Sequence, residues 1–259
     1  MAFDPALDDV ERFCQQAPEH TWPRGWRVEY RREVGSTNDL AREAARRGAS
    51  PGLVYVADYQ TAGRGRLGRS WVAPPGSSLL FSVLWRSSDV GPFKVTMACA
   101  LGAAIGVETV TGLQPSIKWP NDLMLGQRKV AGVLTEVVFG ERVVIGIGVN
   151  VNYAAWPGAL PPTATSLDLE LGRPVPRGPL LAAVLGQIAD LLETEPTDFD
   201  ERVRRPWERR LWRRRQSVHV LEHQGAIEGV VEGIDVDGAL LLRLADGGVR
   251  RVTSGEILP

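Results

Sequence analysis

Residues 60–85 read QTAGRGRLGRSWVAPPGSSLLFSVLW, and this stretch decides between two fold classes. Gly63, Gly65 and Gly68 spell G-x-G-x-x-G, the pattern of a dinucleotide-binding loop. Such a loop must open a helix whose N-terminus meets the pyrophosphate. Here a Pro-Pro-Gly break follows, and the apolar strand 79–85 comes next. The stretch therefore predicts a loop between strands and argues against a Rossmann fold.

The segments around this loop indicate an α+β fold. Residues 95–110 are apolar on nearly every face, with Ala98, Gly102 and Gly106 at four-residue spacing, which predicts a buried helix packed closely on a sheet. Runs with strand character do not alternate regularly with helical runs. We therefore expect a mixed sheet flanked by helices. The predicted strands span residues 26–34, 53–59, 79–85, 116–119, 130–138 and 142–150, the last two joined as a hairpin by Phe139-Gly140-Glu141.

The ends of the chain differ in character. A short helix is predicted near residues 4–15, and another over 40–47, capped by Ser36 or Thr37 and ended by Gly48. From about Arg214 onward, short strands broken by glycines predict a small SH3-like β-barrel. We expect two domains, residues 1–213 and 214–259. An amphipathic helix over 181–192 and a charged helix over 198–213 complete the first domain.

Composition narrows the class of protein. The formal net charge is −1 and the pI is near 6.3, whereas a nucleic-acid binder typically carries a basic excess. No apolar run approaches the roughly 20 residues needed to span a bilayer, and the acidic N-terminus does not resemble a signal peptide. Cys14 and Cys99 lack metal-type spacing. We expect a cytoplasmic protein with no disulfide, no DNA partner and no membrane partner.

Two of the three lysines fall in short motifs that combine charge with unusual backbone. Arg64, Arg66 and Arg69 are interleaved with glycines, an arrangement that suits polyphosphate and carboxylate binding. Lys118-Trp119-Pro120-Asn121-Asp122 groups a cation with oxygen ligands for magnesium or its water shell. Lys129 begins an apolar strand and can reach a buried anion. A basic surface turn and a proline turn with a capping asparagine are the structural alternatives.

These motifs together resemble the biotin–protein ligase family. The similarity runs from Ser36-Thr37-Asn38 through Gln60, the arginine–glycine loop, Lys118–Asp122, Lys129–Gly132 and Gly146-Ile147-Gly148-Val149-Asn150. It continues into the C-terminal strands, including Gly255-Glu256-Ile257, and covers about residues 26 to 257. Some family members carry a DNA-binding domain ahead of the Ser-Thr-Asn segment. Only 35 residues precede Ser36 here, so we expect the single-function type.

The resemblance implies an enzyme that forms biotinyl-AMP from biotin and ATP, aided by Mg²⁺, and then transfers biotin to a lysine of a biotin carboxyl carrier protein domain. It implies Arg66, Lys118 and Lys129 as catalytic residues. Asp122 is the candidate magnesium ligand, and it either acts as a general base or no base exists. The implied biotin-binding residues are Ser36, Thr37, Asn38, Gln60, Gly63, Arg64, Lys129 and Gly132, and the implied nucleotide-binding residues are Arg66, Arg69, Trp71, Lys118, Asn121 and Asn150.

Two other functions compete with this reading. Lipoate–protein ligase shares the broad fold and the chemistry, but its usual arginine-arginine and multiple-glycine signature is missing here. A non-enzymatic biotin- or nucleotide-binding regulator needs no such set of cations. No Ser-His-Asp or Cys-His grouping is apparent, so we expect no covalent enzyme intermediate. Relatives form homodimers through the hairpin sheet, and this assembly stays open for the chain.

Overall fold

The computed structural model describes residues 9–87, 91–223 and 225–258, and a seven-stranded mixed sheet forms its centre. The strand order is β1-β2-β3-β7-β6-β5-β4, with β1 and β2 parallel and all other neighbours antiparallel. This architecture confirms the predicted α+β class. The strands are β1 (Arg27–Val34), β2 (Leu53–Gln60), β3 (Ser78–Arg86), β4 (Ser116–Lys118), β5 (Asp122–Leu125), β6 (Arg128–Phe139) and β7 (Arg142–Asn150).

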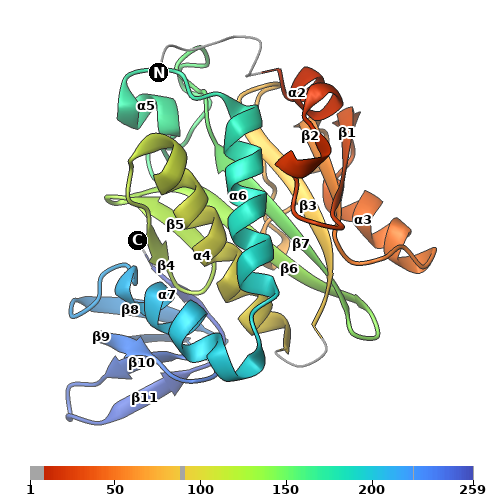
Figure 1. The fold of residues 1–259 in the computed structure, drawn as a ribbon. Coiled ribbons are helices and arrows are strands. Elements are labelled where there is room, and N and C mark those ends of the chain that lie inside the picture. The colour runs from red at the N-terminus through yellow and green to blue at the C-terminus, as the bar shows by residue number, and fades with distance from the viewer. Residues whose placement is uncertain (1–8, 88–90, 224, 259) are drawn as a thin grey trace.

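Two long helices, α4 (Gly91–Thr111) and α6 (Arg177–Leu192), lie side by side over one face of this sheet (Figure 1). A Cβ at Gly102 would come within 2.9 Å of the Ile188 backbone, and one at Gly106 within 2.7 Å of the Val184 backbone. The small residues of α4 therefore let α6 approach closely. The predicted buried helix packed on the sheet is confirmed, and the glycines themselves face α6, which was not predicted.

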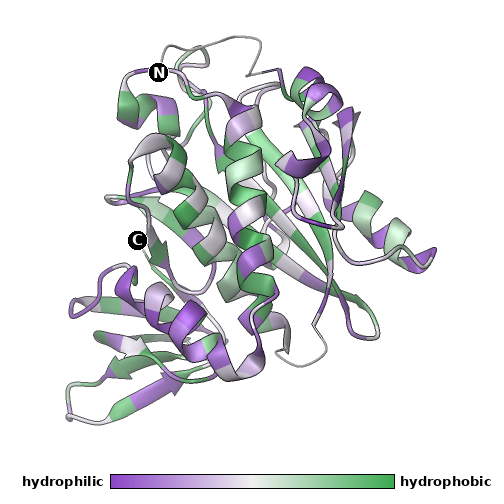
Figure 2. Cartoon of the chain, viewed as in Figure 1, coloured by the Kyte–Doolittle hydropathy of each residue, from purple (hydrophilic) through white to green (hydrophobic). Residues whose placement is uncertain are grey.

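The length of α4 corrects the expectation that no apolar segment of the chain is long enough to span a bilayer. The helix has 21 residues and a window of mean hydropathy 1.4, so by length and composition it could cross a membrane. Within the fold, 67% of that window is buried between α6 and the sheet. Figure 2 shows hydrophobic residues along both α4 and α6, whereas α7 (Arg205–Arg209) is mostly hydrophilic. Burial among other elements is the behaviour of a core helix.

Helix α3 (Thr37–Arg46) packs on the opposite face of the sheet. The helix begins at Thr37, three residues before the predicted Leu40. Ser36 is its N-cap, as predicted, but the Ser36 side chain makes no capping hydrogen bond. Gly48, at φ 86°, follows its end as predicted. The alanines of α3 are buried against strand residues of β2, β3 and β7: Ala41, Ala44 and Ala45 against Leu53, Leu84 and Val144.

The remaining helices are short. Helix α2 (Val10–Gln16) covers part of the predicted helix 4–15, whose first residues lie outside the described part of the chain. The predicted helix 198–213 is helical only as far as Arg209 and is not one continuous α-helix: a π-helical turn (Asp200–Arg204) leads into α7. Pro206 lacks the backbone N–H that a continuous α-helix requires. The sequence analysis also missed α5 (Leu167–Leu171) and the 3₁₀ turns Glu19–Thr21, Arg66–Gly68 and Pro196–Asp198.

A second sheet of five antiparallel strands, ordered β11-β10-β9-β8-β12, follows α7 and is consistent with the predicted small barrel. It lies against the start of α4, since a Cβ at Gly238 would overlap the ring of Phe93 on that helix. It also contacts the segment after β4, where the Trp119 indole N–H donates to the Gly238 carbonyl at 3.1 Å. Its strands are β8 (Ser217–Glu222), β9 (Gly225–Ile234), β10 (Leu240–Arg243), β11 (Val249–Val252) and β12 (Glu256–Ile257).

The register of β3, β7 and β6 sorts their side chains between the two faces. Leu80 pairs with Gly148 and Gly148 with Gly132, while Ser82 pairs with Gly146 and Gly146 with Leu134. Because side chains alternate along a strand, these even-numbered residues share the face of α3. The odd-numbered neighbours belong to the hydrophobic core under α4 and α6. One face is thus a dry core, and the other carries polar residues and glycines.

Candidate functional site

A cavity opens on the α3 face of the sheet, beneath the arginine–glycine loop 63–71. The empty space in it is about 850 Å³, a volume that includes open solvent at its mouth. It brings together segments that lie far apart in the sequence. All predicted site residues except Gly63 and Asn150 line it: Ser36, Thr37, Asn38, Gln60, Arg64, Arg66, Arg69, Trp71, Lys118, Asn121, Asp122, Lys129 and Gly132.

The two exceptions have structural explanations. The Gly63 carbonyl accepts from the Trp71 backbone N–H at 2.9 Å, and a Cβ at Gly63 would overlap the Trp71 carbonyl, so glycine lets the two ends of the loop close. Asn150 is buried, and its side-chain amide donates to the Thr165 carbonyl at 2.9 Å. Its amide supports a neighbouring segment, so the structure does not place Asn150 with the predicted nucleotide-binding residues.

One end of the cavity, the neutral end, is lined by Ser36, Thr37, Asn38 and Gln60, and the buried Ser82 contacts Thr37 and Asn38 behind this lining. Gln60 Oε1 accepts from the Thr37 backbone N–H at 2.7 Å and from its hydroxyl at 3.0 Å. The Ser82 hydroxyl lies 2.7 Å from Thr37 Oγ1 and 2.5 Å from Asn38 Oδ1. Buried polar groups that satisfy one another in this way are held in fixed orientations.

Glycines on β7 explain how side chains from other elements reach the sheet. A Cβ at Gly146 would lie 2.9 Å from Asn38 Cγ and closer still to its amide oxygen. A Cβ at Gly148 would lie 2.6 Å from the Trp71 ring. Both glycines therefore give their space to cavity-lining side chains. The Gly-x-Gly motif of β7 is a docking surface for Asn38 and Trp71.

The opposite end, the cationic end, consists of Arg66, Arg69, Lys118 and Lys129. Lys118 is only 8% exposed, and burial lowers the pKa of its ammonium despite the carboxylates nearby. Burial also lowers the pKa of Arg66, which donates to Asn121 Oδ1 at 3.0 Å and to the Gly255 carbonyl at 3.1 Å. Partly desolvated cations with neutral partners favour the arrival of an anion.

The carboxylates at this end are already paired. Asp122 Oδ1 lies 2.7 Å from Lys129 Nζ, and Glu256 holds Arg69 through two contacts of 2.8 and 2.9 Å. Arg69 thereby lowers the pKa of Glu256. Within the described residues, no three His, Cys, Asp or Glu side chains come together as a metal site. Mg²⁺ usually binds through one or two carboxylates plus substrate phosphates, and Asp122 fits only that limited role.

The indole N–H of Trp71 is a further polar group of the cavity. Within the described residues it is buried and has no hydrogen-bond partner. Lys129 Nζ lies 5.5 Å from the centre of the same ring, in cation–π geometry. A buried donor without an acceptor is uncommon, so a ligand that supplies an acceptor would be favoured here.

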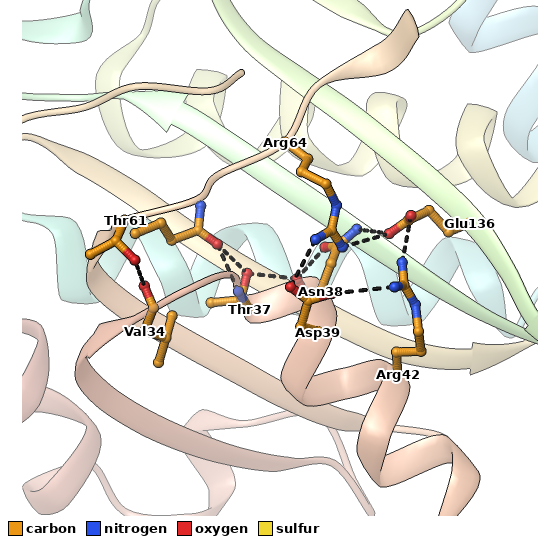
Figure 3. Close-up of polar contacts among 10 residues, drawn as sticks. Val34, Thr37, Asn38, Asp39, Arg42, Thr61, Arg64 and Glu136 are labelled. Atoms are coloured by element: carbon orange, nitrogen blue, oxygen red, sulfur yellow. Dashed lines mark hydrogen bonds and ion pairs between the residues drawn. The ribbon is translucent and has the colours of Figure 1, made fainter. Parts of the chain in front are cut away.

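Four residues of this region, Asp39, Ser82, Glu136 and Glu256, were not predicted from the sequence as ligand-binding residues or as members of the hydrogen-bond network. Arg64 lies 2.8 Å from Asp39 and 3.4 Å from Glu136, so protein carboxylates hold the residue that was expected to face a ligand carboxylate (Figure 3). Glu136 is a charged residue on an otherwise apolar strand, which is a usable sequence signal. Ser82 gave none, because its partner Asn38 is 44 residues away in the chain. Glu256 lies in the Gly255-Glu256-Ile257 motif, but its contact with Arg69, 187 residues away, could not be predicted from that motif.

Comparison with known families agrees with this geometry. Residues 31–152 match the Biotin/lipoate A/B protein ligase family, and residues 216–258 match the Biotin protein ligase C terminal domain. The bifunctional ligase/repressor BirA of Bacillus spizizenii is 31% identical over 242 residues, which cover 90% of this chain and 74% of that protein. The biotin–acetyl-CoA-carboxylase ligase of Paracoccus denitrificans is 33% identical over 80% of this chain and 90% of its own length.

Solved structures give the same assignment. The biotin protein ligase of Aquifex aeolicus in complex with biotin and ATP superposes with a TM-score of 0.78 at 30% identity, covering 89% of this chain and 97% of that one. The chain belongs to the biotin/lipoate A/B protein ligase family and, within it, to the biotin protein ligases.

Proposed function

We propose that the chain activates biotin with ATP as biotinyl-5'-AMP, releasing pyrophosphate, and then passes the biotin to a lysine of a biotin carboxyl carrier protein domain. The observation that carries this proposal is the cavity itself. It joins a neutral end of mutually hydrogen-bonded side chains to a buried cationic end. The uncharged ring system of biotin suits the neutral end. The biotin carboxylate and the triphosphate of ATP suit the cationic end. Lipoate–protein ligase is not favoured, since the C-terminal match is to biotin protein ligases.

In the first step, the biotin carboxylate attacks the α-phosphorus of ATP and the bond to pyrophosphate breaks. Two anions must meet, so charge cancellation and alignment supply most of the rate. Arg66, Lys118 and Lys129 are the catalytic cations in this proposal, and Arg69 and Asn121 assist at the nucleotide. Mg²⁺, when it arrives with ATP, would neutralise phosphate charge, with Asp122 as its protein contact.

At the neutral end, Ser36, Thr37, Asn38 and Gln60 would bind the ureido ring. The carbonyl oxygen of Gln60 is already occupied by Thr37, which leaves its amide N–H groups to donate. Gly132 lies beneath Lys129, because a Cβ there would come within 3.0 Å of Lys129 Nζ. The missing side chain lets the ammonium turn toward the ligand carboxylate, as Arg64 would from the loop.

In the second step, a neutral amine of the carrier lysine attacks the carbonyl carbon of the mixed anhydride. The C–N bond forms, the C–O bond to AMP breaks, and the amine loses its proton. Asp122 is the nearest candidate for a general base, or the proton leaves to solvent. Trp71 would wall the adenylate, with its free indole N–H available to it. No covalent enzyme intermediate is required.

Several wider features belong to the same proposal. Residues 1–213 would form the catalytic domain and 214–259 the small domain, whose Gly255 and Glu256 touch the loop arginines. We propose a cytoplasmic enzyme without a DNA or membrane partner, supported by the near-neutral charge. A homodimer through the sheet of the β6–β7 hairpin remains a prediction.

Pyrophosphate exchange into ATP tests this function directly. Purified protein with Mg²⁺ receives biotin or lipoate in separate reactions, and the assay is repeated with Lys129→Ala and Arg66→Ala. We expect exchange that depends on biotin and is lost in both variants. Exchange with lipoate alone would replace biotin as the substrate, and no exchange from folded protein would leave a non-enzymatic binding protein.

A further inference from the structure

Glu136 accepts contacts from three different parts of the site. On β6 it shares the face of Gly132 and Leu134, so its carboxylate rises from the sheet toward α3. Oε2 accepts from Asn38 Nδ2 at 2.6 Å, and Oε1 accepts from Arg42 Nη2 at 2.7 Å. Arg64 of the loop approaches Oε2 at 3.4 Å (Figure 3). One carboxylate thus touches the neutral end, the body of α3 and the loop above the cavity.

The contact with Asn38 fixes the direction of a side-chain amide. An ionised carboxylate can only accept hydrogen bonds, so the NH₂ group of Asn38 must face Glu136. Its oxygen then faces Ser82, and the Ser82 hydroxyl lies between the two acceptors Asn38 Oδ1 and Thr37 Oγ1. Thr37 in turn donates to Gln60 Oε1. The carboxylate thus fixes the orientation of the Asn38 amide, while Gln60 Oε1 is held separately by the Thr37 backbone N–H.

We propose that Glu136 is a positioning residue for biotin recognition: it fixes the orientation of the Asn38 amide, so that the Asn38 oxygen faces the Ser82 hydroxyl at the neutral end. The proposal rests on the proposed function, because it needs biotin to bind at that end. Glu136 itself does not line the cavity there, so it acts through a residue that does. Its pairing with Arg42 and Arg64 keeps the carboxylate in place.

Glu136→Gln removes the directional constraint with little change in volume. A glutamine amide can accept from Asn38 or donate to it, so the two orientations of the Asn38 amide become similar in energy. We expect the dissociation constant for biotin, measured by calorimetry, to rise about 10-fold, consistent with loss of one charge-assisted hydrogen bond. The KM for ATP in pyrophosphate exchange should stay within about two-fold of wild type, because the cationic end is untouched.

Glu43→Gln is the matched control. It removes a carboxylate of α3 that pairs with Arg47 at 2.9 Å outside the cavity lining, and it leaves the Asn38 contact intact. Its biotin affinity should change less than about three-fold, the scale of an exposed ion pair. The double mutant Asn38→Ala with Glu136→Gln tests whether Glu136 acts through Asn38. If it does, the double mutant should bind biotin no more weakly than Asn38→Ala alone.

Three results would overturn the proposal. These are unchanged biotin affinity in Glu136→Gln, equal losses for biotin and ATP together with a lowered melting temperature, or fully additive losses in the double mutant. Wild-type protein that binds biotin but performs no exchange would refute the proposed function alone, and the dissociation constants would still decide the role of Glu136. Wild-type protein that neither binds nor exchanges would refute both.

Discussion

The two ends of the cavity differ in how their polar groups are satisfied. At the neutral end, Thr37, Asn38, Gln60 and Ser82 hydrogen-bond one another at 2.5 to 3.0 Å. At the cationic end, Lys118 is buried and forms no ion pair within the described residues; its charge faces the Trp212 ring at 5.3 Å instead. The neutral end satisfies most of its own polar groups and leaves the Gln60 amide N–H groups to donate, while at the cationic end the buried Lys118 ammonium has no carboxylate partner among the described residues.

This difference separates selectivity from driving force. A rigid, satisfied network discriminates among ligands, because a wrong ligand leaves buried groups unpaired. Desolvated cations instead stabilise any suitable anion, and the stabilisation is largest for negative charge that develops in the transition state. We therefore expect changes at the cationic end to alter rate and changes at the neutral end to alter affinity for the acid.

The largest expected effect comes from Lys118→Met. If Lys118 faces the transferring phosphate as proposed, removing this buried cation should lower the rate of pyrophosphate exchange by about 10² to 10³-fold. The melting temperature should not fall, because an apolar side chain of similar volume removes a desolvation cost. In the wild type, exchange should decline as the pH rises toward the lowered pKa of Lys118, below its ordinary value of 10.5.

Lys94 provides the control for this change, since it is one of only three lysines and packs on the Phe199 ring away from the cavity. Lys94→Met should leave the exchange rate within about two-fold of wild type. Equal losses in the two variants would mean that general charge, and not the buried position of Lys118, supports the reaction.

Gly146→Ala tests the neutral end with the next largest effect. The added methyl group would collide with Asn38, so the network must shift, and we expect a rise of at least about 10-fold in the KM for biotin with about 1–3 kcal/mol loss of stability. Gly186, on α6, has open space at its Cβ position. Gly186→Ala should stabilise by about 0.5–1 kcal/mol without changing KM. Unchanged biotin kinetics in Gly146→Ala would show that the close Asn38 contact is dispensable.

The sequence predicted more of the site than of its internal connections. Strand periodicity placed most of the sheet correctly, and motif resemblance identified nearly all residues that line the cavity. It did not predict that Gly146 makes room for Asn38, or that Glu136 orients that residue. Such pairings depend on strand register and on contacts between distant segments. Local patterns contain neither. The charged helix was predicted too long for a different reason, because the missing backbone N–H of Pro206 was not taken into account.

Trp71→Phe sharpens the comparison at the boundary between the two ends. The variant keeps the ring over Gly148 but removes the unpartnered N–H. If that donor serves a ligand, the KM for one substrate should rise about 3- to 10-fold with no change in melting temperature, which corresponds to one neutral hydrogen bond. Among the described residues Trp207 is the other indole whose buried N–H has no partner, and it lies in the hydrophobic core. Trp207→Phe should lower stability and leave KM unchanged, and the reverse pattern would refute a ligand role for Trp71.

The smallest effect concerns how the second sheet restrains the cationic end. Arg69 lowers the pKa of Glu256, so this pair stabilises the fold above the ordinary glutamate pKa of 4.5, and the contribution is lost as the pH falls through the lowered value. Since Arg69 is 63% exposed, Glu256→Gln should cost less than about 1 kcal/mol at pH 7. Denaturant titrations of both proteins at pH 7 and in acid should converge at the lower pH. A difference that persists in acid would assign the effect to packing of β12, and the charge pair would then contribute nothing measurable.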